Sequence, residues 1–136
     1  MDCDSQDVVE DFKRKFDQVV QKMGARSTSY GNERNLILFI MDKCSHFVSS
    51  HVIYDDIKAR LVPIFTRYDL EKAEASGKGS IDTMINICLC ARNLSFNDFV
   101  AFVGALAVDH CHAAEQILLA LDEFPTQSQL VRSSTF

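Results

Sequence analysis

The chain contains no tryptophan, and only two prolines and five glycines occur among its 136 residues. So few turn-forming residues argue against an all-β protein, whose many short strands need frequent turns. An excess of basic residues is also missing, since 14 lysines and arginines stand against 19 acidic residues, for a net charge of −5. A surface that binds the phosphate backbone of nucleic acids is therefore not expected.

Long apolar runs and a basic leader are absent as well. The longest apolar runs, residues 36–41 and 99–108, fall short of the ~20 residues that a membrane-spanning helix needs. The first seven residues are acidic and polar, unlike the basic start of a signal peptide. The odd number of cysteines, five, favours reduced thiols. We therefore expect a cytoplasmic protein with no integral membrane segment.

Hydrophobic residues make up 47% of the chain, and they recur at the three- and four-residue steps typical of amphipathic helices. This pattern predicts about seven helices, over residues 5–23, 33–48, 52–65, 66–75, 81–91, 96–108 and 112–124. Between them we expect loops at 25–32 and 76–79, a break at 49–51, and a kink or a new helix start at Pro63. Thr66, Ser80 and Ser95 are the predicted N-caps.

The predicted helix 96–108 is apolar on nearly all sides, which is typical of a helix buried at the centre of a fold. The sequence therefore predicts an all-α helical bundle around this central helix. One domain is expected over residues 1–126, followed by a polar tail over 127–136.

Residues suited to chemistry occur, but their spacing does not match a known catalytic or metal site. Cys88 and Cys90 point to nearly opposite sides of a helix and cannot easily share one ion. The glycine-rich segment 76–80 lacks the Walker spacing and a preceding strand, and no nucleophile motif occurs. We expect no catalysis, metal or cofactor; a metal or redox sensor built on cysteine and histidine, with residues 110–112, stays an alternative.

Two segments remain for a protein-binding function. The first, residues 52–61, carries the pattern of an apolar residue, two acidic residues and a second apolar residue in Ile53, Asp55, Asp56 and Ile57. The second, residues 95–107, begins with Ser-Phe-Asn-Asp and continues as an apolar run. In this order and separation the two segments resemble the BH3 and BH1 motifs of the Bcl-2 family, and Val8–Phe12 is similar to the start of its BH4 helix.

The resemblance implies a Bcl-2-like bundle that binds an amphipathic helix in a hydrophobic groove. By position in the motifs, the groove residues would be Ile57, Arg60, Leu61, Phe65, Tyr68, Ile85, Cys88, Leu89, Arg92, Ser95, Asp98 and Val100. The implied function is inhibition of apoptosis by sequestering pro-apoptotic BH3 proteins. The implied place is the cytoplasm, that of the host cell for a viral protein, with peripheral attachment to mitochondria through partners.

The motifs also depart from the family pattern. Tyr54 replaces the usual small residue of BH3, and Asp98 replaces the BH1 arginine that in the family pairs with the ligand's aspartate. A narrow ligand range is therefore expected, and Arg60 or Arg92 are candidates for the missing cation. The tryptophans of the family's BH2 motif are absent. A compact chain with eroded motifs is most similar to a virus-encoded homologue.

Two alternatives stay open. An exposed apolar groove on a small domain can be covered by a second copy, so a homodimer is one of them. The other is a CARD-type death-fold adaptor that assembles through paired charges. The charges concerned would be Asp55, Asp56, Asp69, Glu71 and Glu74 against Arg34, Lys43 and Arg92.

Overall fold

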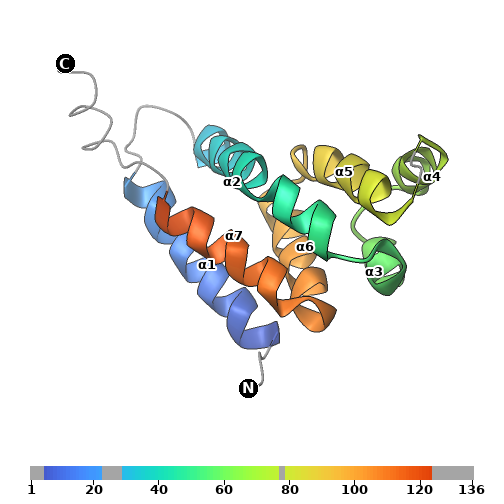
Figure 1. Cartoon of the computed structure of the whole chain (residues 1–136). Helices are drawn as coiled ribbons and strands as arrows, with labels where there is room; N and C mark the ends of the chain where they lie inside the picture. The colour runs from blue at the N-terminus through green and yellow to red at the C-terminus, as the bar shows by residue number, and fades with distance from the viewer. Residues whose placement is uncertain (1–4, 23–28, 77–78, 124–136) are drawn as a thin grey trace, which may run out of the picture.

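The structure is a computed structural model that describes residues 5–22, 29–76 and 79–123 (Figure 1). These residues form seven helices and no strand. The helices are α1 (Ser5–Lys22), α2 (Ser29–His51), α3 (Tyr54–Leu61), α4 (Arg67–Ser76), α5 (Ser80–Ala91), α6 (Phe96–Asp109) and α7 (Cys111–Glu123). The predicted all-α class is confirmed. The predicted tail, residues 127–136, lies outside the described residues.

Helix α6 runs through the interior of the bundle. Seven of its 14 residues are buried, because apolar side chains occur on nearly every side of the helix. It packs against α1 and α7 and also against α3 and α2, and Figure 1 shows it between α7 and α3. The prediction of a buried central helix is confirmed.

The contact between α1 and α6 is aromatic and close. The rings of Phe12 and Phe99 lie 5.7 Å apart, and those of Phe99 and Phe102 lie 6.0 Å apart, measured between centroids. All three side chains are fully buried. Gly104 allows the close approach, since a Cβ atom there would lie 3.2 Å from Cγ2 of Val9.

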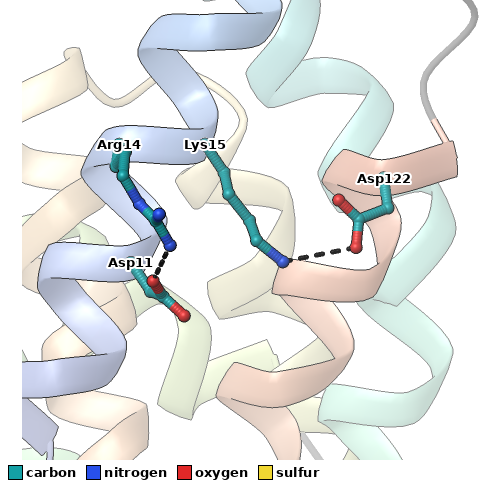
Figure 2. Close-up of polar contacts among 4 residues, drawn as sticks. All are labelled: Asp11, Arg14, Lys15 and Asp122. Atoms are coloured by element: carbon teal, nitrogen blue, oxygen red, sulfur yellow. Dashed lines mark hydrogen bonds and ion pairs between the residues drawn. The ribbon is translucent and has the colours of Figure 1, made fainter.

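At the surface, a charge pair links α1 to α7. Figure 2 shows the Lys15 ammonium pointing across to Asp122, with Nζ and Oδ2 3.3 Å apart. Arg14 instead pairs with Asp11 on its own helix. All four side chains are at least partly exposed, so these ion pairs contribute only ~0–1 kcal/mol each. The stability of this side of the bundle comes from the buried aromatic contacts.

Helix α2 is longer than predicted at both ends. The predicted loop at 25–32 is wrong for residues 29–32, which are helical, and its residues 25–28 lie outside the described residues. The predicted break at 49–51 is helical too, so that prediction was wrong. The polar side chains at the C-terminal end bond to the helix itself: Ser49 Oγ donates to the His46 carbonyl at 3.2 Å, and His51 Nδ1 lies 3.0 Å from the Phe47 carbonyl. These local bonds let serine and histidine continue the helix.

The predicted helix 52–65 is shorter than expected. It begins at Tyr54 and ends at Leu61, before Pro63. The N–H groups of Ile64 and Phe65 both donate to the Leu61 carbonyl at 2.9 Å, so the chain turns there. Pro63 thus separates α3 from α4, in agreement with its effect on a helix.

Two of the three predicted N-caps are confirmed. Thr66 Oγ1 accepts a bond from the Asp69 N–H at 3.1 Å, and Ser95 Oγ accepts one from the Asp98 N–H at 3.3 Å. Ser80 is not a cap, because Gly79 precedes α5 with a φ of 141°, a conformation that favours glycine. The Ser80 hydroxyl instead accepts a bond from the Tyr54 N–H at 2.9 Å and so joins α5 to α3.

No helix in the described parts of the chain combines the length and the apolar character needed to cross a membrane.

Candidate helix-binding surface

Three large apolar side chains lie exposed along one face of α5. Ile81, Ile85 and Leu89 keep 55%, 43% and 51% of their surface exposed. Their four-residue spacing places them in one row along the helix. The buried residues of α5 lie on another face and are Thr83, Met84, Ile87, Cys88 and Ala91. Helix α5 therefore has an apolar inner face and an apolar outer face; we call Ile81, Ile85 and Leu89 the α5 stripe.

A pocket of about 200 Å³ lies between α4 and α5, beside the stripe. It is lined by Asp69, Lys72, Ala73, Asn86, Leu89 and Cys90. Leu89 belongs to both the pocket and the stripe, and Asn86 fixes the two helices by donating to the Ala73 carbonyl at 3.2 Å. The pocket is smaller than the ~300–1,000 Å³ typical of small-molecule sites. It is better suited to a side chain of a protein partner than to a cofactor.

Tyr68 extends this surface on α4. Its side chain is exposed, and Nζ of Lys72 lies 6.0 Å from the centroid of its ring. We use the name α4–α5 surface for the α5 stripe, the pocket and Tyr68 together. Half of the large apolar side chains that the described residues expose belong to this surface; the others are Ile53, Val62, Val108 and Leu119. Exposed apolar side chains gathered on adjacent helices indicate an interaction site more strongly than isolated ones do.

Five of the twelve predicted groove residues are in the core. These are Ile57, Leu61, Phe65, Cys88 and Val100, each with at most 8% of its surface exposed. They lie beneath the surface, where they support α3, α5 and α6, rather than on it. Tyr68, Ile85 and Leu89, by contrast, are exposed on the α4–α5 surface.

The four remaining predicted residues are polar. Ser95 is the N-cap of α6 and Asp98 lies in its first turn, and both side chains are exposed. Arg60 and Arg92, the candidate cations, each lie close to a carboxylate of the chain. The structure therefore brings together the apolar residues Tyr68, Ile85 and Leu89 of the predicted groove on α4 and α5, and it does not bring the four polar residues into contact with them.

A polar network holds α3 against α4. The Tyr54 hydroxyl donates to Glu74 Oε2 at 2.5 Å, and Lys58 Nζ lies 3.0 Å from the same oxygen. The pKa of Glu74 is lowered, first by the Tyr54 hydrogen bond and then by that of Lys58. Burial, and then the bond to Glu74, raise the pKa of Tyr54, so the phenol stays a donor at physiological pH. The network keeps α3 and α4 in a fixed relation along the edge of the α4–α5 surface.

The junction of α6 and α7 holds the other side of α3. Nε2 of His110 lies 3.3 Å from Oδ2 of Asp56, and Nε of Arg60 lies 3.4 Å from Oδ2 of Asp109. The Arg60–Asp109 pair, together with the network around Glu74, connects α3 to its neighbours through polar groups on both sides, whereas His110 Nε2 is buried and makes no hydrogen bond within the described parts of the chain. Its buried residues, Tyr54, Ile57 and Leu61, supply the apolar part of the contact.

The cysteines of the described residues do not form a metal site. Burial raises the pKa of Cys88 to about 12 and that of Cys44 to about 11, so both thiols stay protonated. Cys90 is partly buried, and burial raises its pKa too. Cys111 is disulfide-bonded, which corrects the expectation of reduced thiols at this position. Within the described ranges, no three histidine, cysteine or acidic side chains are grouped so that they could hold a metal.

Four of the eight charges of the CARD alternative lie near a basic or acidic side chain of the same chain. Asp56 and Glu74 take part in the contacts of α3, Glu71 lies 2.9 Å from Arg67, and Arg92 lies 2.6 Å from Asp42. Assembly through these charges would require their present partners to be displaced. The structure offers no separate observation in favour of this alternative.

Several members of the α4–α5 surface were not predicted from the sequence. Ile81 extends the stripe by one turn, and its position four residues before Ile85 is the signal that could have identified it. The pocket members Asp69, Lys72, Ala73, Asn86 and Cys90 were not selected either. Their grouping depends on how α4 packs on α5, which no local pattern encodes.

Comparisons with protein-family models, with curated proteins and with solved structures give no match for this chain. The functional assignment therefore depends on the residues and the geometry described above.

Proposed function

We propose that this protein inhibits apoptosis by sequestering pro-apoptotic BH3 helices, in the manner of the Bcl-2 family, and that it performs no catalysis. The observation that carries the proposal is the α5 stripe, an exposed apolar row beside a pocket. A partner helix with apolar residues at helical spacing can pack along such a row. Full burial of a large apolar side chain contributes ~1.5–3 kcal/mol, and each stripe residue, being about half exposed, can gain about half of that on binding.

The positions of the two sequence motifs support the proposal. The BH3-like segment contains α3, and the BH1-like segment begins α6, the central helix. Helix α3 packs against both α5 and α6, and α4 packs against α5. The BH3-like segment thus belongs to a helix that adjoins α5, and the BH1-like segment begins the helix on which α3 packs. The buried residues Ile57, Leu61 and Phe65 form the support of the ligand site, and the ligand contacts Tyr68, Ile85 and Leu89.

Calorimetric titration with a panel of BH3 peptides tests the proposal. We expect submicromolar binding of one or a few peptides by the wild-type protein. Leu89→Glu places a charge in both the stripe and the pocket, so it should weaken binding by ~30-fold or more, as expected for a central contact worth about 2 kcal/mol. Leu119→Glu is the matched control, because Leu119 is 54% exposed but lies on α7.

Circular dichroism should show unchanged helical content for both variants, since both side chains point outward. Two outcomes count against the proposal: folded wild-type protein that binds no peptide, and Leu89→Glu that binds as tightly as Leu119→Glu. Sedimentation of the free protein completes the test, because a dimer that Leu89→Glu dissociates would show that a second copy covers the stripe.

A further inference from the structure

A second pocket lies where the start of α5 meets α3 and the end of α4. Its volume is about 280 Å³. Helix α3 contributes Tyr54, Asp55 and Lys58 to its wall, α4 contributes Glu74, and α5 contributes Ser80 and Thr83. It shares no lining residue with the pocket of the α4–α5 surface, so the two are separate sites. The volume is near the lower end of the ~300–1,000 Å³ typical of small-molecule sites, and the polar wall suits a small polar ligand.

The hydroxyl of Thr83 is a buried polar group in the wall of this pocket. Thr83 keeps only 6% of its surface exposed. Its backbone N–H bonds to the Gly79 carbonyl at 3.0 Å, but none of the residues that the structure describes forms a hydrogen bond with its side-chain oxygen. A buried hydroxyl without a partner costs free energy, and a ligand that bonds to it recovers that cost. Because a hydroxyl can donate or accept, the charges around it decide which ligand it suits.

The charges around the pocket are mostly negative. Asp55 and Glu74 supply two carboxylates to its wall and Lys58 supplies one ammonium, while Asp82 adds a carboxylate in the first turn of α5. Lys58 is engaged with Glu74, with Nζ and Oε2 3.0 Å apart. Asp55 has no ion pair with any other described residue. The partial positive charge at the start of a helix, ~0.5 of an elementary charge, does not offset this excess, so the pocket favours a cation.

An organic ammonium suits these groups better than a metal ion does. In the parts of the chain that the structure describes, no three histidine, cysteine or acidic side chains are grouped so that they could hold a metal. An ammonium group donates three hydrogen bonds, which carboxylate and hydroxyl oxygens accept. The Ser80 oxygen accepts the Tyr54 N–H at 2.9 Å and keeps a second lone pair for another donor. Asp55 and Thr83 offer further acceptor oxygens.

We infer that this pocket binds the ammonium group of a primary amine, supplied by a free alkylamine or by a lysine side chain of a partner protein. The ammonium forms an ion pair with Asp55 and donates to the Thr83 hydroxyl, while Lys58 stays with Glu74. The occupant thus links α3 to α5, in addition to the bond between Tyr54 and Ser80. The inference is independent of the proposed function, since it uses no residue of the α4–α5 surface.

The test is a titration of the whole chain, labelled with nitrogen-15, and followed by the chemical shifts of its backbone amides. The probes are n-butylamine and a lysine blocked at both its amino and carboxyl groups. We expect saturable shifts at Ser80 and Thr83 with a dissociation constant in the millimolar range, as suits so small a ligand, and none at Leu89 and Cys90. Blocked lysine that binds at least as tightly as n-butylamine assigns the site to a partner's lysine, and weaker binding assigns it to a free amine.

Two variants examine the groups that carry the inference. Asp55→Asn should weaken the binding of n-butylamine by about fivefold, as expected for an exposed ion pair. Asp17→Asn is its matched control, because it removes the same charge from an exposed position on α1.

Thr83→Val keeps the shape of the side chain and should weaken binding by about tenfold, since it removes an acceptor for a charged donor. Urea denaturation of Thr83→Val should show a stability equal to or above that of the wild type, because the hydroxyl has no partner in the free protein. A hydroxyl with a purely structural role would give the opposite pair of results, a lower stability and an unchanged affinity.

Three outcomes overturn the inference. The first is that neither amine causes saturable shifts at Ser80 and Thr83. The second is that n-butanol or acetate, the uncharged and the negative control, binds there as tightly as n-butylamine. The third is that Asp55→Asn binds n-butylamine as tightly as Asp17→Asn does. None of these outcomes changes the titration with BH3 peptides, so the failure of this inference and that of the proposed function are distinguishable.

Discussion

The two sides of the central helix are built from different interactions. Helices α1 and α7 cover one side with long helices and aromatic contacts, such as those of Phe12 with Phe99. Helices α3 and α4, with eight and ten residues, lie on the other side, where polar pairs such as Tyr54–Glu74 and Arg60–Asp109 make the connections. Figure 1 shows these two groups of helices at opposite ends of the molecule.

The difference indicates where a ligand can bind. On the α1 side the phenylalanine rings face inward and are already in contact with each other, and among the described residues of α1 and α7 Leu119 is the one large apolar side chain left exposed. On the α4–α5 surface, similar side chains stay in contact with water, and their burial by a partner is favourable. Polar pairs keep the short helices in position without covering these side chains.

The largest effect should come from the aromatic side of this comparison. Phe99→Ala removes a fully buried ring that contacts Phe12 and Phe102, and it should lower the free energy of unfolding by ~3–5 kcal/mol. Leu89→Ala should change it by only ~0.5 kcal/mol or less, because Leu89 is exposed. Urea denaturation measures both. Similar losses in the two variants would show that Leu89 is packed and that the comparison is wrong.

A smaller effect is expected for the polar connection between α3 and α4. Tyr54→Phe keeps the buried ring but removes the hydroxyl that donates to Glu74, so the free energy of unfolding should fall by ~1–2 kcal/mol. Tyr68→Phe is the control, because its ring is exposed and should tolerate the change. Denaturation of both variants under the same conditions gives the difference. An unchanged stability in Tyr54→Phe would mean that packing alone holds α3.

The stability that the Tyr54–Glu74 connection contributes should depend on pH. The pKa of Glu74 is lower in the folded protein than its ordinary value of 4.5, so the folded state favours the charged carboxylate. Its stabilising contribution is therefore present above that ordinary value and is lost as the pH falls through the lowered folded-state pKa. The free energy of unfolding of Glu74→Gln should fall less steeply than that of the wild type over this range. Parallel curves for the two proteins would contradict the role assigned to Glu74.

The smallest expected effect is a difference in thiol labelling between the pocket and the core. Cys90 lines the pocket and is partly exposed, whereas Cys44 and Cys88 are buried. Iodoacetamide should therefore alkylate Cys90 before the other two, as followed by mass spectrometry of digested protein. A bound BH3 peptide should slow the labelling of Cys90. Labelling of Cys88 at the same rate would show that α5 opens away from the core.

Much of the fold could be predicted because its signals are local. Apolar spacing identified the helices, and the position of Asp three residues after Thr66 and Ser95 identified two N-caps that the structure contains. Ser80 carries the same type of hydroxyl, but its partner is the Tyr54 N–H, which lies 26 residues away in the chain. The role of a polar side chain whose partner is distant could not be inferred from its neighbours in sequence.

The candidate site could be predicted only in part, for a related reason. Ile57 and Leu61 on α3 have the same four-residue spacing as Ile85 and Leu89 on α5, yet the first pair is fully buried and the second pair is exposed. Periodicity shows that residues share a face of a helix. Whether another helix covers that face is decided by tertiary packing, and here α5 and α6 cover the apolar face of α3.

The shortness of α3 has a consequence for its dynamics. Eight residues form about two turns, and isolated helices shorter than ~12–15 residues are marginal in water. Helix α3 therefore stays helical through its contacts with α4, α5, α6 and His110, and it unwinds when those contacts are lost. The exchange of its amide protons with deuterium then reports the opening of this one segment, separately from the unfolding of the whole chain.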